Sequence, residues 1–196
     1  MSGTSNRPCA RVDNWYWGLA LSLVLSAFVP ATALEWSRPA LADGELWRLV
    51  TGHWVHLSLT HLALNLAGLM VVALLYPQLH QRMIDSLALL TIALLVSTGL
   101  YLLSPELTWY RGFSGCLHGL LVYGALRRIL QAPLWSLVIL VLVAAKLLVE
   151  QLDDAMPGVA GAIGGPVIIT AHQLGAVGGL LAGATVLAIP SWRTTG

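Results

Sequence analysis

The stretch that decides the fold is GFSGCLHGLLVYGAL, residues 112–126, because it is uncharged, mostly apolar and too short to cross a bilayer. These 15 residues would make a helix of about 22 Å, whereas the hydrocarbon core is about 30 Å thick. If Arg127 and Arg128 hold one end at the inner interface, Ser114 lies beneath the opposite surface. Non-helical backbone at that depth is tolerated only beside a wet cavity or inside protein. The short segment therefore predicts water within the membrane, next to Ser114.

The composition of the chain excludes an ordinary soluble domain. Apolar residues make up 57% of the 196 residues and charged residues 10%, with a mean hydropathy of +0.78, whereas soluble domains are about one quarter charged. A net charge of +1 gives no reason to expect nucleic acid as a partner. Cys9 and Cys116 are expected in a cytoplasmic tail and a membrane helix, so neither a disulfide scaffold nor a metal site is predicted.

Uncharged segments predict an all-α, polytopic membrane protein that forms one domain over residues 1–196. The first run, Asn14–Leu34, has 21 residues, and a membrane-spanning helix needs about 20. Ala31-Thr32-Ala33 resembles a signal-peptidase site, but the run is long enough to span, so we expect the first helix to be retained. The six predicted helices are 15–34, 59–76, 86–103, 113–127, 133–150 and 167–189.

The distribution of arginine predicts the orientation of these helices. Positive residues favour the cytoplasmic side of a membrane protein. One side would carry Arg7, Arg11, Arg82, Arg127, Arg128 and Arg193, and the other only Arg38, Arg48 and Arg111. Both termini are therefore expected in the cytoplasm, with Ser114 towards the outer face.

Histidines in or beside the apolar segments are the second unusual feature: His53, His56, His61, His118 and His172. Ionisable residues within a membrane usually face the protein interior or a water-filled site. A single one is most simply a buried histidine that bonds a carbonyl group. Several of them at the depth of Ser114 indicate a shared polar cavity.

A serine hydroxyl needs a base within hydrogen-bond reach to become a nucleophile. His118 is one turn along the helix of Ser114, while His172 would reach Ser114 from the last helix. His118 lies deeper, away from the substrate, so His172 is favoured as the base. His61 and Asn65, four apart on one helical face, and the backbone N–H of Ser114 could stabilise an oxyanion. No acidic residue is expected near His172, which predicts a Ser-His dyad without a third member.

Glycines at helical spacing would let the helices of Ser114 and His172 approach closely. Gly175, Gly179 and Gly183 follow His172, and Gly115 and Gly119 follow Ser114. Such stripes are common packing surfaces in membranes. We expect the two stripes to bring the serine and the histidine together.

These motifs resemble the signatures of the rhomboid intramembrane serine proteases. The resemblance rests on HWVHLSLTHLALN at 53–65, GFSG at 112–115 and AHQLGAVGG at 171–179, with ELWR at 45–48 similar to the family's Trp-Arg element. It implies a six-helix rhomboid core with a short, buried fourth helix. It also implies that Ser114 is the nucleophile and His172 the base, with oxyanion or supporting groups at His61, Asn65, His56 and Gly112. No metal or organic cofactor is implied.

The string RGFSGCLHG, residues 111–119, is most similar to the rhombosortase branch of that family. Many rhomboids carry tyrosine where this chain has His118, which makes His118 a candidate neighbour of the base. The resemblance implies cleavage of carboxy-terminal Gly-Gly sorting tails of secreted proteins at the periplasmic side of a bacterial inner membrane. After this cleavage, the new carboxyl end would be transferred to a lipid-derived amine.

Several alternatives stay open at this stage. The chain could be a generic rhomboid protease for other transmembrane substrates, or a non-proteolytic relative that binds membrane clients, although such a relative would be expected to lack Ser114 or His172. A small transporter would more often show two similar halves. MPGVAGAIGGP, residues 156–166, reads as a flexible outer loop that could cover the site, and Lys146 is most simply an ion-pair partner of Glu150. The oligomeric state is not predicted.

Overall fold

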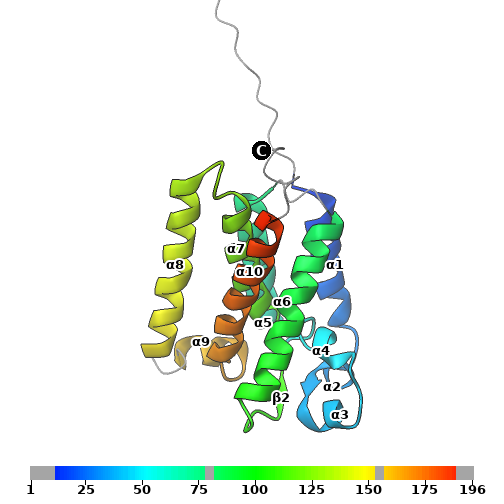
Figure 1. Ribbon diagram of the computed structural model, residues 1–196. Helices are drawn as coiled ribbons and strands as arrows, with labels where there is room; N and C mark the ends of the chain where they lie inside the picture. The colour runs from blue at the N-terminus through cyan, green and yellow to red at the C-terminus, as the bar shows by residue number, and fades with distance from the viewer. Residues whose placement is uncertain (1–11, 78–81, 153–156, 189–196) are drawn as a thin grey trace, which may run out of the picture.

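The computed structural model describes residues 12–77, 82–152 and 157–188, and this part of the chain is mostly helical (Figure 1). The elements are α1 Asn14–Ser26, α2 Ala31–Leu34, β1 Trp36–Ser37, α3 Arg38–Ala42, α4 Arg48–Thr51, α5 Leu59–Leu75, α6 Arg82–Leu103, β2 Trp109–Tyr110, α7 Ser114–Arg127, α8 Pro133–Leu152, α9 Pro157–Ile163 and α10 Ile169–Ala188. The prediction of a mostly helical protein is confirmed, with one small β pairing that it did not include.

Three of the described helices are long and apolar enough to cross a membrane: Met83–Leu103, Pro133–Leu152 and Ile169–Ala188. Helix α5 is apolar but shorter. Figure 1 shows the start of α1 and the end of α10 at one end of the bundle, with α2, α3, α4, α9 and β2 at the other. The short elements therefore gather at one end of the helix bundle.

The first predicted helix, 15–34, is wrong in its length, because α1 ends at Ser26. The Ser26 hydroxyl donates to the Leu23 carbonyl at 2.7 Å and lies 2.6 Å from the Trp54 carbonyl, which fixes the chain where the helix stops. Pro30 then disfavours helical backbone at the preceding residue and offers no N–H group. Hydropathy alone does not register this break, because the residues on both sides of it are apolar.

The third predicted helix also differs, because α6 begins at Arg82 and includes the charged Asp85. Asp85 is fully buried, forms an ion pair with Arg127, and accepts a hydrogen bond of 2.8 Å from the Tyr123 hydroxyl. A buried carboxylate is tolerable when it is paired and hydrogen-bonded. This cluster fastens the end of α7 to α6.

Helix α7 is the short helix that the sequence predicted, with 14 residues, most of them buried. Beside it lies α10, whose buried glycines face the glycines of α7 (Figure 1). A Cβ atom placed on Gly175 would overlap the carbonyl oxygen of Gly115, and one on Gly179 would overlap that of Gly119. The backbones of α7 and α10 are therefore in direct contact along this surface.

We predict that Gly175→Ala separates α7 from α10 and lowers the stability of the protein. The added methyl group would have to displace the backbone of α7, and overpacking of this kind costs about 1–3 kcal/mol of unfolding free energy. The matched control is Gly18→Ala on α1, where an added Cβ meets nothing within 4 Å. Unfolding of both variants in denaturant-detergent mixtures checks the prediction. Equal behaviour of the two variants would contradict it.

The start of α7 is held by the loops at the opposite end. β1 pairs antiparallel with β2, placing Trp36 opposite Tyr110, two residues before Gly112. The Gly112 N–H donates to the Gly52 carbonyl at 3.2 Å. Buried Arg48, from the ELWR segment, donates to the carbonyl groups of Thr32 and Glu35 at 2.9 and 2.8 Å. Segments far apart in sequence thus fix where α7 begins.

The segment predicted as a flexible loop, 156–166, contains helix α9, Pro157–Ile163, in its described part. The N–H groups of Gly164 and Gly165 donate to the Ala160 carbonyl, and Gly164 has a φ of 86°. Glycine tolerates this left-handed conformation after a helix end. The expectation of an unstructured loop is therefore wrong for residues 157–163.

Candidate active site

Ser114 and His172 meet at the start of α7 and near the start of α10. The Ser114 Oγ lies 2.8 Å from His172 Nε2, and the His172 side chain is 7% exposed. Ser114 is the first residue of α7, and Phe113 before it makes no side-chain cap. The first N–H groups of a helix lack intrahelical partners, so the amide of Ser114 is free to bind an oxygen atom.

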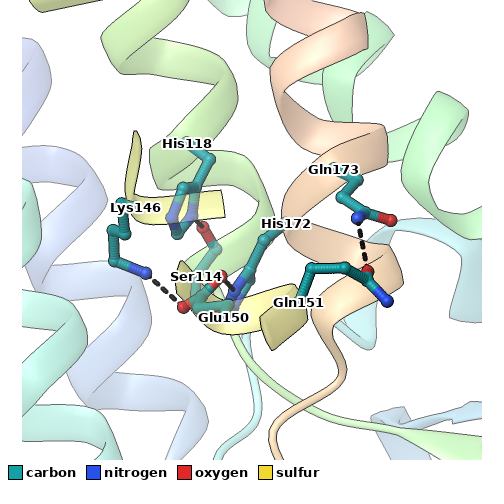
Figure 2. Close-up of polar contacts among 7 residues, drawn as sticks. All are labelled: Ser114, His118, Lys146, Glu150, Gln151, His172 and Gln173. Carbon is teal, nitrogen blue, oxygen red and sulfur yellow. Dashed lines mark hydrogen bonds and ion pairs between the residues drawn. The ribbon is translucent and has the colours of Figure 1, made fainter. Parts of the chain in front are cut away.

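Glu150 of α8 lies on the other side of His172, which the sequence analysis did not foresee (Figure 2). Its Oε2 atom is 2.9 Å from His172 Nδ1, and its Oε1 atom forms an ion pair with Lys146. The expectation that no acidic residue lies near His172 is wrong. The ion pair with Lys146 is present, but it accounts for only one of the two carboxylate oxygens. An acidic residue in an apolar helix was the sequence signal that could have found it.

His118 stacks on His172 instead of reaching the Ser114 hydroxyl. The two rings are 4.3 Å apart between centroids and inclined by 18°. The His118 Nδ1 atom lies 2.8 Å from the Ser114 carbonyl oxygen, and since a carbonyl can only accept, Nδ1 carries the proton. His118 therefore contacts the His172 ring, and it is His172 whose ring nitrogen lies within hydrogen-bond distance of the Ser114 hydroxyl.

His61 and Asn65 line the same cavity as Ser114, and both are buried. The Leu57 N–H donates to His61 Nδ1 at 3.4 Å, so the neutral ring carries its proton on Nε2. The Asn65 amide donates to the His61 carbonyl at 3.0 Å. The two side chains thus offer N–H groups close to the start of α7.

Gly112 has a φ of 132°, a conformation that favours glycine. A Cβ there would lie 2.8 Å from the His61 ring. The Tyr110 hydroxyl donates to the Gly112 carbonyl at 2.7 Å. Gly112 therefore lets the His61 ring pack against the backbone just before Ser114.

The other two histidines among the described residues lie outside this cavity. The His56 ring meets the His61 ring edge to face, with centroids 5.1 Å apart, and it lines a separate cavity together with Ser26 and Ser58. His53 is fully buried, and its Nε2 lies 3.0 Å from the Ala93 carbonyl and 3.0 Å from the Ser97 hydroxyl. His56 is placed to support His61, whereas His53 fits the simpler interpretation of a hydrogen-bonded buried histidine.

The cavity at Ser114 has a volume of about 370 Å³. Polar groups occupy one part of its wall and apolar side chains the rest, including Leu64, Val71 and Leu117. Val159, Ile163 and Pro166, in and just after α9, also line it, and the Ser58 hydroxyl donates to the Ile163 carbonyl at 2.7 Å. The α9 segment therefore forms part of the cavity wall.

His118, Glu150 and His172 offer donor atoms within 4.8 Å of one another, as a metal site would. Both Glu150 oxygens already bond other residues, and the two imidazole rings are nearly parallel. The lone pairs of two stacked rings lie in nearly parallel planes that are separated by the stacking distance, so they do not converge on one ion. This set therefore suits hydrogen bonding better than tetrahedral metal ligation.

The model of the rhomboid domain matches residues 43–189, which is most of the chain. The chain belongs to the rhomboid family. No curated protein matches it. As a rhomboid protein, it is a multi-pass membrane protein. The matched range includes the residues of the polar cavity described above, namely Ser114, His172, His61, Asn65 and Glu150.

Proposed function

We propose that this rhomboid protein is an intramembrane serine endopeptidase, with Ser114 as nucleophile and His172 as general base. The observation that carries the proposal is the contact of 2.8 Å between Ser114 Oγ and His172 Nε2 at the wall of a cavity. In this proposal α1, α5, α6, α7, α8 and α10 are the six helices of the rhomboid core. Both termini are cytoplasmic and the cavity opens to the periplasm, in line with the arginine distribution.

The chemistry would run in two steps. Ser114 Oγ attacks the scissile carbonyl carbon while its proton passes to His172 Nε2, and the peptide C–N bond breaks as that proton moves to the leaving amine. The product is an ester between Ser114 and the new carboxyl end. Water or an amine, deprotonated by His172, then breaks the ester and restores the serine hydroxyl.

In this proposal three groups stabilise the oxyanion: the backbone N–H of Ser114, the Nε2–H of His61 and the amide of Asn65, and their support is that all three residues line one cavity. Fixed donors of this kind are most effective where water is excluded, because a low dielectric strengthens them. His56 supports the His61 ring from behind.

For the substrate, we propose the carboxy-terminal tails of secreted proteins, in which a Gly-Gly motif precedes one apolar helix and basic residues. The support is the similarity of residues 111–119 to the rhombosortase branch and the stacking of His118 on the base. A transmembrane substrate must unwind before its carbonyl is accessible. Glycine assists, since it costs a helix about 1 kcal/mol relative to alanine.

The experiment is a cleavage assay with purified protein in liposomes and a soluble reporter that carries such a tail. The expected result is cleavage next to the Gly-Gly motif, found by mass spectrometry, and labelling of Ser114 by a fluorophosphonate. The control tail has Leu-Leu in place of Gly-Gly. Equal cleavage of both tails would indicate a generic rhomboid protease, and no cleavage or labelling of either would indicate a client-binding relative. The product mass distinguishes release by water from transfer to an added amine.

A further inference from the structure

Helix α8 carries two charged residues near one end of an otherwise apolar sequence. Lys146 Nζ forms an ion pair with Glu150 Oε1, and Glu150 Oε2 lies 2.9 Å from His172 Nδ1 (Figure 2). The Lys146 side chain is 51% exposed, whereas that of Glu150 is 3% exposed. The carboxylate therefore points from α8 into the protein, towards α10.

The protons in this chain of contacts can be assigned. A carboxylate only accepts hydrogen bonds, so His172 Nδ1 carries a proton, and this N–H group donates a hydrogen bond to Glu150. The Nε2 atom of the neutral ring is then an acceptor, and it faces the Ser114 hydroxyl, which donates to it. The contact with Glu150 thus selects the tautomer in which His172 can act as a base.

We propose that Glu150 is a positioning residue for His172, and that Lys146 holds the Glu150 carboxylate in place and ionised. This inference rests on the proposed function, because it gives Glu150 a role in activating Ser114 through His172. When His172 takes the serine proton it becomes a buried cation beside the Lys146–Glu150 pair. The Glu150 carboxylate would stabilise that cation where water is scarce.

A purely structural role explains the position of Glu150 less well. The buried residues of α8 are Ser136, Val143 and Glu150, while its neighbours Leu148 and Val149 are 60% and 52% exposed. An i,i+4 ion pair with Lys146 could form equally well on the exposed side of the helix. An apolar residue at 150 would pack without the desolvation cost of a buried carboxylate, which is several kcal/mol. A carboxylate that is buried and directed at His172 can instead both accept the hydrogen bond from Nδ1 and stabilise the ring when it is positively charged.

The test is Glu150→Gln, which keeps the side-chain shape and removes the charge, assayed for kcat, KM and the rate of fluorophosphonate labelling of Ser114. We expect kcat and the labelling rate to fall roughly 10²- to 10³-fold, with KM nearly unchanged. This loss is smaller than the roughly 10⁴-fold cost of a reversed tautomer, since the glutamine oxygen can still accept from Nδ1. Glu150→Asp should restore part of the loss, and Lys146→Met should cost less than about tenfold in kcat, because Lys146 is the half-exposed member of the pair and solvent screens its charge.

The matched controls are Gln151→Ala and Gln173→Ala. Gln151 follows Glu150 on α8, and Gln173 follows His172 on α10. The Gln173 amide donates to Gln151 Oε1 at 2.9 Å, away from Ser114 (Figure 2). Both variants should keep kcat. If Glu150→Gln also keeps kcat while Ser114→Ala is inactive, the role of Glu150 is refuted and the proposed function stands. If Ser114→Ala keeps activity, the proposed function itself fails.

If Glu150→Gln does not fold, the double variant Lys146→Met/Glu150→Gln replaces it. Removing both charges of a buried pair is tolerated far better than removing one of them. A folded double variant with the same loss of kcat and labelling supports the inference. A folded double variant with the kcat of the wild type overturns it.

Discussion

Replacing Ser114 with alanine is expected to abolish cleavage of the tail-bearing substrate, with kcat lower by roughly 10⁴- to 10⁶-fold. Alanine leaves no oxygen to attack the scissile carbonyl, so no ester intermediate forms. Alanine is also the best helix former, so α7 should keep its structure. The measurements are kcat in liposomes and the loss of fluorophosphonate labelling.

The matched control for this prediction is Ser136→Ala. Ser136 is also a helical serine, and it is buried, but it lies at the other end of α8 from Glu150 and lines a different cavity, with Arg128 and Trp135. This variant should cleave the substrate at the rate of the wild type. A Ser114→Ala protein that retains a substantial part of its kcat would rule out the nucleophile proposed here.

His172→Ala is expected to have the second largest effect, with kcat lower by roughly 10⁴- to 10⁶-fold as well, because base and nucleophile act as one unit. The Ser114 hydroxyl would lose the acceptor at 2.8 Å, and Glu150 would be left facing an empty space. Labelling of Ser114 should therefore fall in parallel with cleavage. Combining His172→Ala with Ser114→Ala should lower kcat little further.

His118→Ala is the control for the base. Its ring stacks on His172, and its Nδ1 atom bonds the Ser114 carbonyl and not the hydroxyl. A stacked ring pair contributes about 0.5–1.5 kcal/mol, so the loss of kcat should stay within about tenfold. If His118→Ala abolished cleavage and His172→Ala did not, the assignment of the base would be wrong.

Much of the fold followed from local sequence features. The short buried helix α7, the apolar helices α5, α8 and α10, and the glycines of α7 and α10 were all evident in the order of residues. The end of α1 was not, because Ser26 stops the helix through a hydrogen bond to Trp54, 28 residues away. Charge counting likewise missed the first turn of α6, since Asp85 is buried against Arg127.

The sequence by itself determined that this chain enters a membrane and that a serine and several histidines lie within it, because transfer into lipid depends on the composition of each segment. Only the tertiary structure decided which of these side chains meet. Glu150 and His172 are 22 residues apart on different helices, and their contact depends on how α7, α8 and α10 are rotated and spaced. The glycine spacing predicted that α7 and α10 approach, as where Gly175 meets Gly115. The rotation of α8 that turns Glu150 towards His172 depends on packing among all three helices, and no local pattern encodes it.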